Sequence, residues 1–450
     1  MYHIHESEVI YMFTRIKVKN FKSLKNLEID LRKNSSSINN FIAIYGENGS
    51  GKTNIIEIFK FLTLSFSHKI MKTKVGIFNN SHIDNTIRTI VNPLLLDFKY
   101  SSYRTIDCEE PTEIEYNFEI NGKEGSYFIK FYDEVIEERL HFKVTRQNNY
   151  YYEISKAENK IIKKLNEKVF VKENYKNELE EEIEKYWGKF SFLSILNNEI
   201  NEKNLKYMHD SLNDNIFDIF NMIEDMNVFI DRYKLSPLLI DYASTQMDLV
   251  SLKTGTIRKK DTKEKILKYE QALKLFFTQS YFDVKDVKYD FIEKEDYTEY
   301  KLYFYKKIGS RIIKIPIDEE SSGTIKLIEH FKTLMGCLDG KIVIVDEIDN
   351  GIHDLLIKNI FESLLDKITG QLIVTTHNTL LLEFVPKEKI YILSTDSYNN
   401  KILHNINDYD VNVQKNNNLR NLYLKGVFGG IPTNENIHFD NINTVLFKQK

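Results

Sequence analysis

Residues 46–53 read GENGSGKT and lie between two apolar segments whose patterns differ. The segment before them, residues 41–45 (FIAIY), is short and uninterrupted, which is typical of a strand buried on both faces. After them, residues 55–62 (IIEIFKFL) place apolar side chains at helical spacing. The sequence therefore predicts a glycine-rich loop that joins a buried strand to a helix.

This loop fits the pattern GxxxxGK[ST], and phosphate chemistry explains the spacing. Glycines let successive backbone N–H groups curl around an anion, and the following helix directs its positive end to the same place. A chance glycine-rich turn would also fit so permissive a pattern, but the strand before it and the helix after it favour a phosphate site. The residues predicted to bind a triphosphate are Gly46, Glu47, Asn48, Gly49, Ser50, Gly51, Lys52 and Thr53.

Four side chains have individual roles in this prediction. Lys52 would reach the β- and γ-phosphates, and the Thr53 hydroxyl would bind Mg²⁺. A second buried run, residues 342–345 (IVIV), ends in Asp346 as a further metal ligand and Glu347, which can orient or deprotonate the attacking water. The alternative is two surface carboxylates that begin a loop, and the phosphate-loop pattern elsewhere in the chain disfavours it.

Three further segments resemble motifs of ABC-type ATPases and occur in the ABC order. They resemble the signature, the D-loop and the switch-histidine motif, and they are residues 320–324 (ESSGT), 351–354 (GIHD) and 374–378 (VTTHN). The resemblance implies that Ser322 and Gly323 contact the γ-phosphate held by a second subunit, and that His377 steadies that phosphate. Taken alone, the first segment is an ordinary helix N-cap and His377 is a surface or packing histidine.

Both ends of the chain resemble one group within these ATPases, in residues 16–24 (IKVKNFKSL), 345–353 (VDEIDNGIH) and 423–432 (YLKGVFGGIP). The group comprises soluble bacterial ABC-like ATPases of the AAA type, related to OLD, RecF and SMC heads and to phage-defence, or abortive-infection, ATPases. The resemblance implies an α/β P-loop NTPase head of ABC type, with a mixed sheet, flanking helices, an antiparallel β subdomain and an inserted helical arm. It also implies ATP and Mg²⁺ as ligands and a head-to-tail sandwich of two copies around ATP. No clear Q-loop glutamine follows the first lobe, and residues 92–94 (NPL) stand in that place.

The pattern along the chain predicts three units. Lobe I of the head covers residues 1–150 and contains the phosphate loop and a β subdomain. A helical insertion covers residues 151–283. Lobe II covers residues 284–450 and contains the signature, the Asp346–Glu347 pair, His377 and the tail. Apolar and polar residues alternate, as in strands, on both sides of an Asn-Gly turn at 121–122 and again at 285–317. Residues 160–187 show a charged helical pattern instead. Further helices are expected at 203–232, 262–279 and 354–367, and buried strands at 371–374 and 390–393.

Composition indicates the cellular compartment in which the protein is expected. The 450 residues carry a formal net charge of −4, two widely spaced cysteines and no run of about 18 apolar residues. We therefore expect a reduced, cytoplasmic protein with no membrane partner. The near-neutral charge leaves DNA binding open, including at residues 258–260 (RKK), which are otherwise a solvated turn.

Two functions fit these features. The first is an ATP-hydrolysing regulator, whose nucleotide-gated head association controls an effector such as a nuclease or toxin in bacterial anti-phage defence. The alternative is a DNA-repair or DNA-maintenance ATPase of RecF or SMC type. A transporter subunit is disfavoured by the NFKS opening and the missing Q-loop. The pair Asp408 and Asp410 has the spacing of a nuclease motif, but the tail is too short for that domain, and a polar loop is the preferred interpretation.

Overall fold

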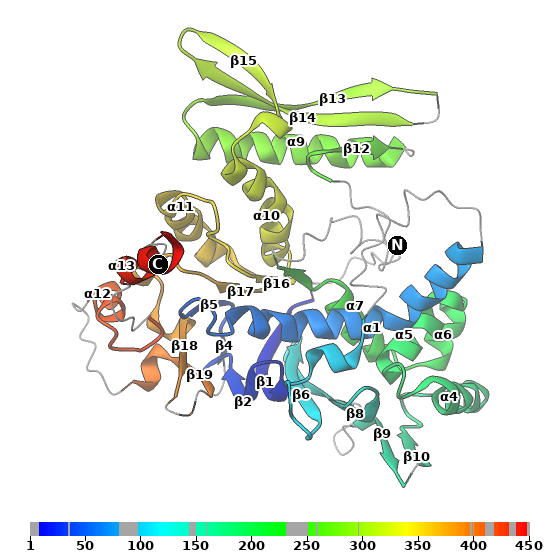
Figure 1. The fold of residues 1–450 in the computed structure, drawn as a ribbon. Coiled ribbons are helices and arrows are strands. Elements are labelled where there is room, and N and C mark those ends of the chain that lie inside the picture. Colours follow the sequence, from blue (N-terminus) through cyan, green and yellow to red (C-terminus); the bar gives the residue numbers. More distant parts are fainter. Residues whose placement is uncertain are drawn as a thin grey trace.

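The computed structural model describes residues 9–34, 37–80, 98–143, 150–158, 160–230, 251–257, 260–295, 297–396, 398, 400–409, 418–431 and 438–447. Within these residues the chain forms three main sheets with helices between and around them (Figure 1). A short hairpin, β3 (Arg32–Asn34) and β4 (Ser37–Ile38), lies beside them.

A six-stranded sheet in the order β11-β16-β17-β5-β18-β19 forms the centre of the head. Its strands are β5 (Phe41–Tyr45), β11 (Asn227–Phe229), β16 (Ile342–Val345), β17 (Gln371–Thr375), β18 (Ile390–Thr395) and β19 (Lys401–Asn405). All neighbours pair in parallel except β18 and β19. The strands predicted at 41–45, 342–345, 371–374 and 390–393 are thus confirmed. The helix predicted over 203–232 is wrong at 227–229, which form β11 because they pair in parallel with β16.

Both faces of this sheet are covered, which explains why its strands are apolar without alternation. Ile42 and Ile44 of β5 face one hydrophobic core, whereas Phe41, Ala43 and Tyr45 face a second core on the opposite side. The second core contains α10 (Ser322–Leu338) and α11 (Asp354–Leu364), which lie where helices were predicted. Every residue of β5 is buried as a result.

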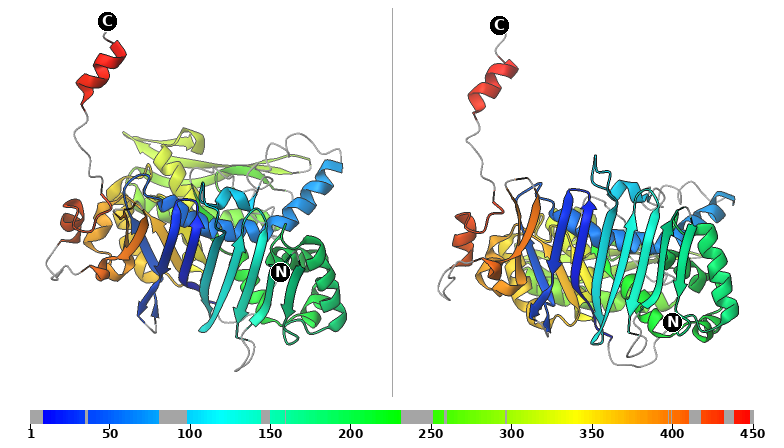
Figure 2. Two further views of the ribbon diagram at one scale, coloured as in Figure 1. Left: turned by 60° about the horizontal axis from the view of Figure 1, so that its bottom comes forward. Right: turned by 90° about the horizontal axis from the view of Figure 1, so that it is seen from below.

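A seven-stranded antiparallel sheet covers the other side, with α1 (Lys52–Asn80) between the two sheets (Figures 1 and 2). Phe59 of α1 packs against Phe13 with ring centroids 5.2 Å apart, and the Tyr116 hydroxyl donates to the carbonyl of Ile58 at 2.7 Å. The strands are β1 (Tyr11–Phe21), β2 (Leu24–Asp30), β6 (Thr112–Ile120), β7 (Lys123–Phe131), β8 (Val135–Phe142), β9 (Tyr150–Ala157) and β10 (Lys160–Leu165). The predicted hairpin around 121–122 joins β6 to β7.

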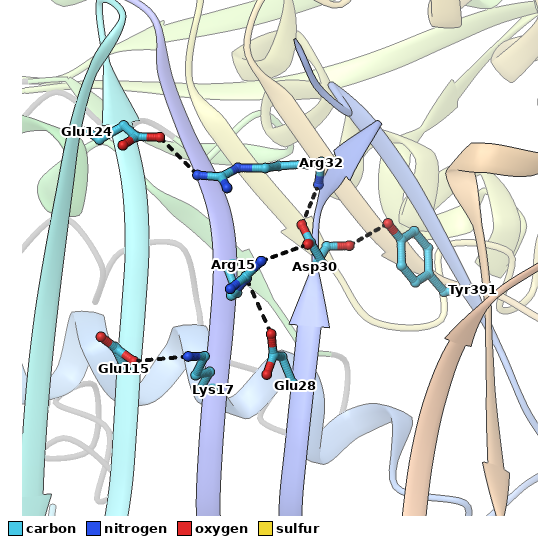
Figure 3. Close-up of polar contacts among 8 residues, drawn as sticks. All are labelled: Arg15, Lys17, Glu28, Asp30, Arg32, Glu115, Glu124 and Tyr391. Atoms are coloured by element: carbon cyan, nitrogen blue, oxygen red, sulfur yellow. Dashed lines mark hydrogen bonds and ion pairs between the residues drawn. The ribbon is translucent and has the colours of Figure 1, made fainter. Parts of the chain in front are cut away.

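Charged side chains cover the outer face of this sheet (Figure 3). Arg15 contacts Glu28 at 3.3 Å and Asp30 at 3.1 Å, and Lys17 pairs with Glu115 on the neighbouring strand β6. Arg32 of the hairpin strand β3 pairs with Glu124 of β7. Exposed pairs of this kind contribute only about 0–1 kcal/mol each, so they specify register more than stability. The Tyr391 hydroxyl donates to the Asp30 carbonyl at 2.6 Å and ties β18 of the central sheet to β2 (Figure 3).

The predicted helical region 151–283 is helical only in part. Residues 160–165, predicted as the start of a charged helix, form β10 because they pair antiparallel with β9 at the sheet edge, a contact that helical periodicity cannot reveal. Of the remainder of that prediction, residues 166–172 are not helical and residues 173–186 are confirmed by α4 (Glu173–Tyr186). Helices α5 (Phe192–Glu202), α6 (Leu205–Ser211) and α7 (Asn215–Glu224) follow.

The elements of this region belong to two different cores. Helices α4 to α7 pack into the core of α1 and the seven-stranded sheet. Helix α9 (Lys260–Ser280) packs instead on a four-stranded sheet formed by β12 (Thr254–Ile257), β13 (Val284–Glu293), β14 (Thr298–Ile308) and β15 (Arg311–Pro316). The alternation predicted at 285–317 is therefore confirmed, and the domain boundaries at 151 and 283 stay a prediction.

Two short helices follow the central sheet. Helix α12 (Leu419–Leu424) lies against the head near β18, whereas α13 (Phe439–Phe447) stands apart from the body of the molecule in both views of Figure 2. Among the helices in the described ranges, none combines the length and apolar character needed to cross a bilayer.

Candidate active site

The phosphate loop begins where β5 ends at Tyr45 and closes where α1 begins at Lys52. A turn within it is held by the Ser50 N–H, which donates to the Glu47 carbonyl at 3.2 Å. The Ser50 hydroxyl is buried and has no hydrogen-bond partner among the described residues. Because an unpaired buried hydroxyl is costly, an anion held in the loop would supply the acceptor that it lacks.

Lys52 places a cation inside the same loop. Its ammonium donates to the carbonyl oxygens of Gly46 at 2.7 Å and Glu47 at 3.0 Å, and the side chain is almost completely buried. Burial lowers the pKa of Lys52, although the nearby carboxylates of Asp346 and Glu347 oppose the shift. The loop therefore offers backbone donors, a hydroxyl and an ammonium, which is a donor set that fits a triphosphate.

The strand order explains how distant carboxylates reach this loop. Strand β17 lies between β5 and β16, so its carboxyl end lies between the end of β5, where the loop begins, and the acidic pair. The Thr375 hydroxyl donates to Asp346 Oδ1 at 2.6 Å and accepts from the Glu347 N–H at 2.8 Å. Glu347 has a φ of +48°, a left-handed conformation that is uncommon for a residue with a side chain, and the Thr375 contact holds it there.

A second contact positions the switch segment, residues 374–378, which contains His377. The His377 N–H donates to both carboxylate oxygens of Asp349, at 3.1 and 3.3 Å. Partial burial and the positive charge of Lys52 lower the pKa of His377, while Asp349 and Glu347 oppose the shift. The imidazole is therefore neutral near pH 7, and one ring nitrogen can donate while the other accepts.

The predicted signature residues lie elsewhere in the same molecule. Ser322 and Gly323 form the first turn of α10, and the Ser321 side chain caps that turn by accepting from the Thr324 N–H at 3.2 Å. A Cβ atom on Gly323 would lie 2.7 Å from the Gly351 carbonyl, so the helix start packs tightly on the D-loop segment. Figure 1 shows α10 starting beneath the four-stranded sheet, away from the start of α1.

The structure thus brings together the loop 46–53, Asp346, Glu347 and His377, and keeps Ser322 and Gly323 apart from them. Sequence reasoning missed Thr375 and Asp349 as supporting residues, although both stand inside motifs that it singled out. Asp408 accepts from the Asn405 N–H at 3.0 Å in a capping turn, in keeping with the polar loop that was predicted. The residues proposed for the Q-loop position, 92–94, lie outside the described residues, as do Arg258, Lys259 and Asp410.

Comparison with known proteins adds a family and several similar structures. Residues 41–383 match the family model described as "AAA domain, putative AbiEii toxin, Type IV TA system". The match contains the phosphate loop, the Asp346–Glu347 pair and His377. Among curated proteins, none matches this chain.

Three similar solved structures are heads of SMC proteins, each 15% identical to this chain. A crystal structure of an SMC head bound to the C-terminal winged-helix domain of ScpA has a TM-score of 0.45 and covers 87% of this chain and 96% of its own. The SMC head domain from Thermotoga maritima has a TM-score of 0.36 and covers 87% and 98%. An SMC head with an extended coiled coil, bound to the C-terminal domain of ScpA derived from Pyrococcus furiosus, has a TM-score of 0.35 and covers 88% and 96%.

Proposed function

This chain belongs to the AAA-domain family whose model matches residues 41–383, and on that premise we propose that it binds and hydrolyses ATP. The observation that carries the proposal is the meeting of Lys52, Asp346, Glu347 and His377 at the carboxyl ends of three adjacent parallel strands. Ligands of α/β sheets bind at that edge. Each of these side chains lies within electrostatic reach of the others, so they can act on one phosphate group.

The roles of the side chains follow from their chemistry. The loop 46–53 holds the phosphates, and Lys52 exchanges its carbonyl contacts for β- and γ-phosphate oxygens. Thr53 and Asp346 would hold Mg²⁺, which supplies positive charge against the phosphate oxygens. Glu347 accepts the proton of the attacking water, and His377, as a neutral imidazole, donates to the γ-phosphate.

We also propose that the site is completed by a second copy of the chain. Ser322 is exposed at the start of a helix, where its hydroxyl and the backbone N–H groups of the first turn can face an anion on a partner molecule. A head-to-tail dimer would place the Ser322–Gly323 turn of each copy against the nucleotide held by the other. ATP would then stabilise the dimer, and hydrolysis would release it.

The cellular role that we propose is control of an effector, such as a nuclease or toxin, in anti-phage defence. The family description names an AbiEii toxin and a type IV toxin–antitoxin system, which supports a role in this class of systems. The helices α4 to α7 also support it, because they pack into the head core and do not project as the long arm that an SMC-type protein needs.

The dimer can be tested by mixing two inactive variants. Lys52→Ala removes the loop cation, and Ser322→Arg blocks the exposed helix start without disturbing a buried contact. In a mixed head-to-tail dimer one site carries both substitutions and the other site carries neither. If subunits exchange freely in an equal mixture, about half of the dimers are mixed and one of their two sites is intact. The mixture should therefore recover about a quarter of wild-type phosphate release.

The matched control is Ser363→Arg on α11, another exposed serine, which should stay active alone. A mixture no more active than its components would contradict the shared site, and full activity of Ser322→Arg alone would contradict its role.

The Thr375 hydroxyl gives a second prediction within the proposed mechanism. Thr375→Val keeps the shape but removes two hydrogen bonds that hold Asp346 and Glu347, and kcat should fall about tenfold, with KM little changed. Thr375→Ser keeps the hydroxyl and should recover most of the rate. Steady-state phosphate release checks both variants, and a valine variant as fast as the wild type would show that the hydroxyl does not position Asp346 and Glu347 for the reaction.

A further inference from the structure

The segment that includes α12 and the turn after it, residues 418–431, has no role in the mechanism above. Residues 423–432 of this part of the chain resemble a C-terminal motif of defence ATPases. In the structure the segment turns back onto the central sheet, where Phe428 and Tyr423 are buried in the core that also contains Tyr45. It therefore lies beside the strand that leads into the phosphate loop.

The first contact of this segment is with the phosphate loop itself. Gly430 has a φ of +70°, and a Cβ atom there would lie 2.7 Å from Ile392 Cγ2 and 3.5 Å from the Cα atom of Gly46, where the loop begins. The Tyr423 hydroxyl donates to the Gly430 carbonyl at 3.1 Å. The Tyr423 ring packs against Tyr45 with centroids 5.5 Å apart. Gly430 therefore lies beside the start of the loop, and Tyr423 holds it there.

The second contact is with the switch segment. The Tyr45 hydroxyl donates to the Asn378 carbonyl at 2.9 Å, directly after His377. From α12, Arg420 donates to Thr379 Oγ1 at 3.1 Å and to Glu383 Oε1 at 2.9 Å. The same short segment therefore holds both sides of the nucleotide site.

We propose that three residues of this segment, Arg420, Tyr423 and Gly430, form a clamp that fixes the phosphate loop against residues 377–383, with Tyr423 and Gly430 as positioning residues. The proposal rests on ATP as the ligand. A phosphate loop binds through many backbone donors at once, so a small displacement of Gly46 misplaces several of them together. The clamp acts on that displacement without touching the nucleotide.

Two glycine substitutions separate this role from stability. Gly430→Ala places a methyl group 2.7 Å from Ile392 Cγ2, so the backbone beside Gly46 must shift to relieve the clash, whereas Gly429→Ala places one 3.3 Å from Ser394 Cβ, away from the loop. Both glycines have a left-handed φ, +70° and +68°, so the conformational cost of alanine is shared. Titration with a fluorescent ATP analogue and Mg²⁺ should show a Kd at least tenfold higher for Gly430→Ala, and a Kd within twofold of wild type for Gly429→Ala.

A pair of hydroxyl deletions tests the same idea with less risk to folding. Tyr423→Phe removes the bond to Gly430, and Tyr409→Phe removes an equivalent bond from a tyrosine hydroxyl to the Phe428 carbonyl, 2.7 Å long. The first should raise the Kd severalfold and the second should not, while thermal unfolding records any shared loss of stability.

The outcomes are distinct. Equal Kd values for Gly430→Ala and Gly429→Ala, together with equal values for Tyr423→Phe and Tyr409→Phe, would overturn the clamp while wild-type binding still supports the ATPase. Absence of binding by the wild-type protein would refute the proposed function itself, and the clamp with it.

Discussion

Glu347→Gln is expected to bind ATP with nearly wild-type affinity but to release phosphate at least about 100-fold more slowly, because general-base catalysis commonly contributes 10²–10⁴-fold. Glutamine has the shape of glutamate, and its carbonyl oxygen can keep the 3.3 Å contact with the Asn350 amide. Its backbone N–H can still donate to Thr375, so the left-handed conformation and the position of Asp346 are retained. What is lost is the proton acceptor for water.

The slow variant should also accumulate as a dimer when ATP is present, since the state that hydrolysis normally ends persists. Light scattering with and without ATP measures the dimer, and single-turnover phosphate release measures the chemical step. Glu362→Gln, an exposed carboxylate on α11, is the matched control and should behave as wild type. Rapid turnover by Glu347→Gln would rule out its role as the base, and a monomer under all conditions would rule out the sandwich.

Lys52→Ala is expected to weaken ATP binding at least about 100-fold, because it removes the only cation of the loop 46–53 and with it a charge-assisted contact to the phosphates. The fold should not suffer. Burial already disfavours the Lys52 ammonium and lowers its pKa, so its removal relieves a desolvated charge. The melting temperature of the free protein should therefore stay the same or rise while binding is lost.

Fluorescence titration with an ATP analogue and thermal unfolding without nucleotide together check this pattern. Lys72→Ala provides the control, since Lys72 is an exposed lysine of the same helix. A wild-type Kd for Lys52→Ala would show that the loop does not hold phosphate through this residue. A large fall in melting temperature would show instead that Lys52 supports the fold.

The sequence predicts those residues of the site that belong to short, contiguous motifs. A buried strand, a glycine loop and a helix are adjacent in the chain, and their local pattern predicts the loop 46–53. Asp346 and Glu347 follow a buried strand, and parallel strands end at one edge of a sheet, so their approach to the loop could also be predicted.

What the sequence could not predict depends on pairing between distant segments. Nothing in the local pattern of 160–165 distinguishes an edge strand from a charged helix until β9 is beside it. The bridge from Thr375 to Asp346 requires that β17 insert between β5 and β16, which is a property of strand order. The contact of Gly430 with Gly46 depends in the same way on how the chain returns to β5 after β18.

The position of β5 in the chain has a consequence for how the protein is made. Tyr45 and its partner Asn378 are 333 residues apart, and both neighbours of β5 in the sheet come from the last quarter of the sequence. At about 5–20 residues per second, the ribosome needs on the order of 20 to 70 seconds to supply that partner. During this interval a wholly apolar strand has no sheet to join, so the nascent chain should depend on chaperones until β17 and β18 have been made.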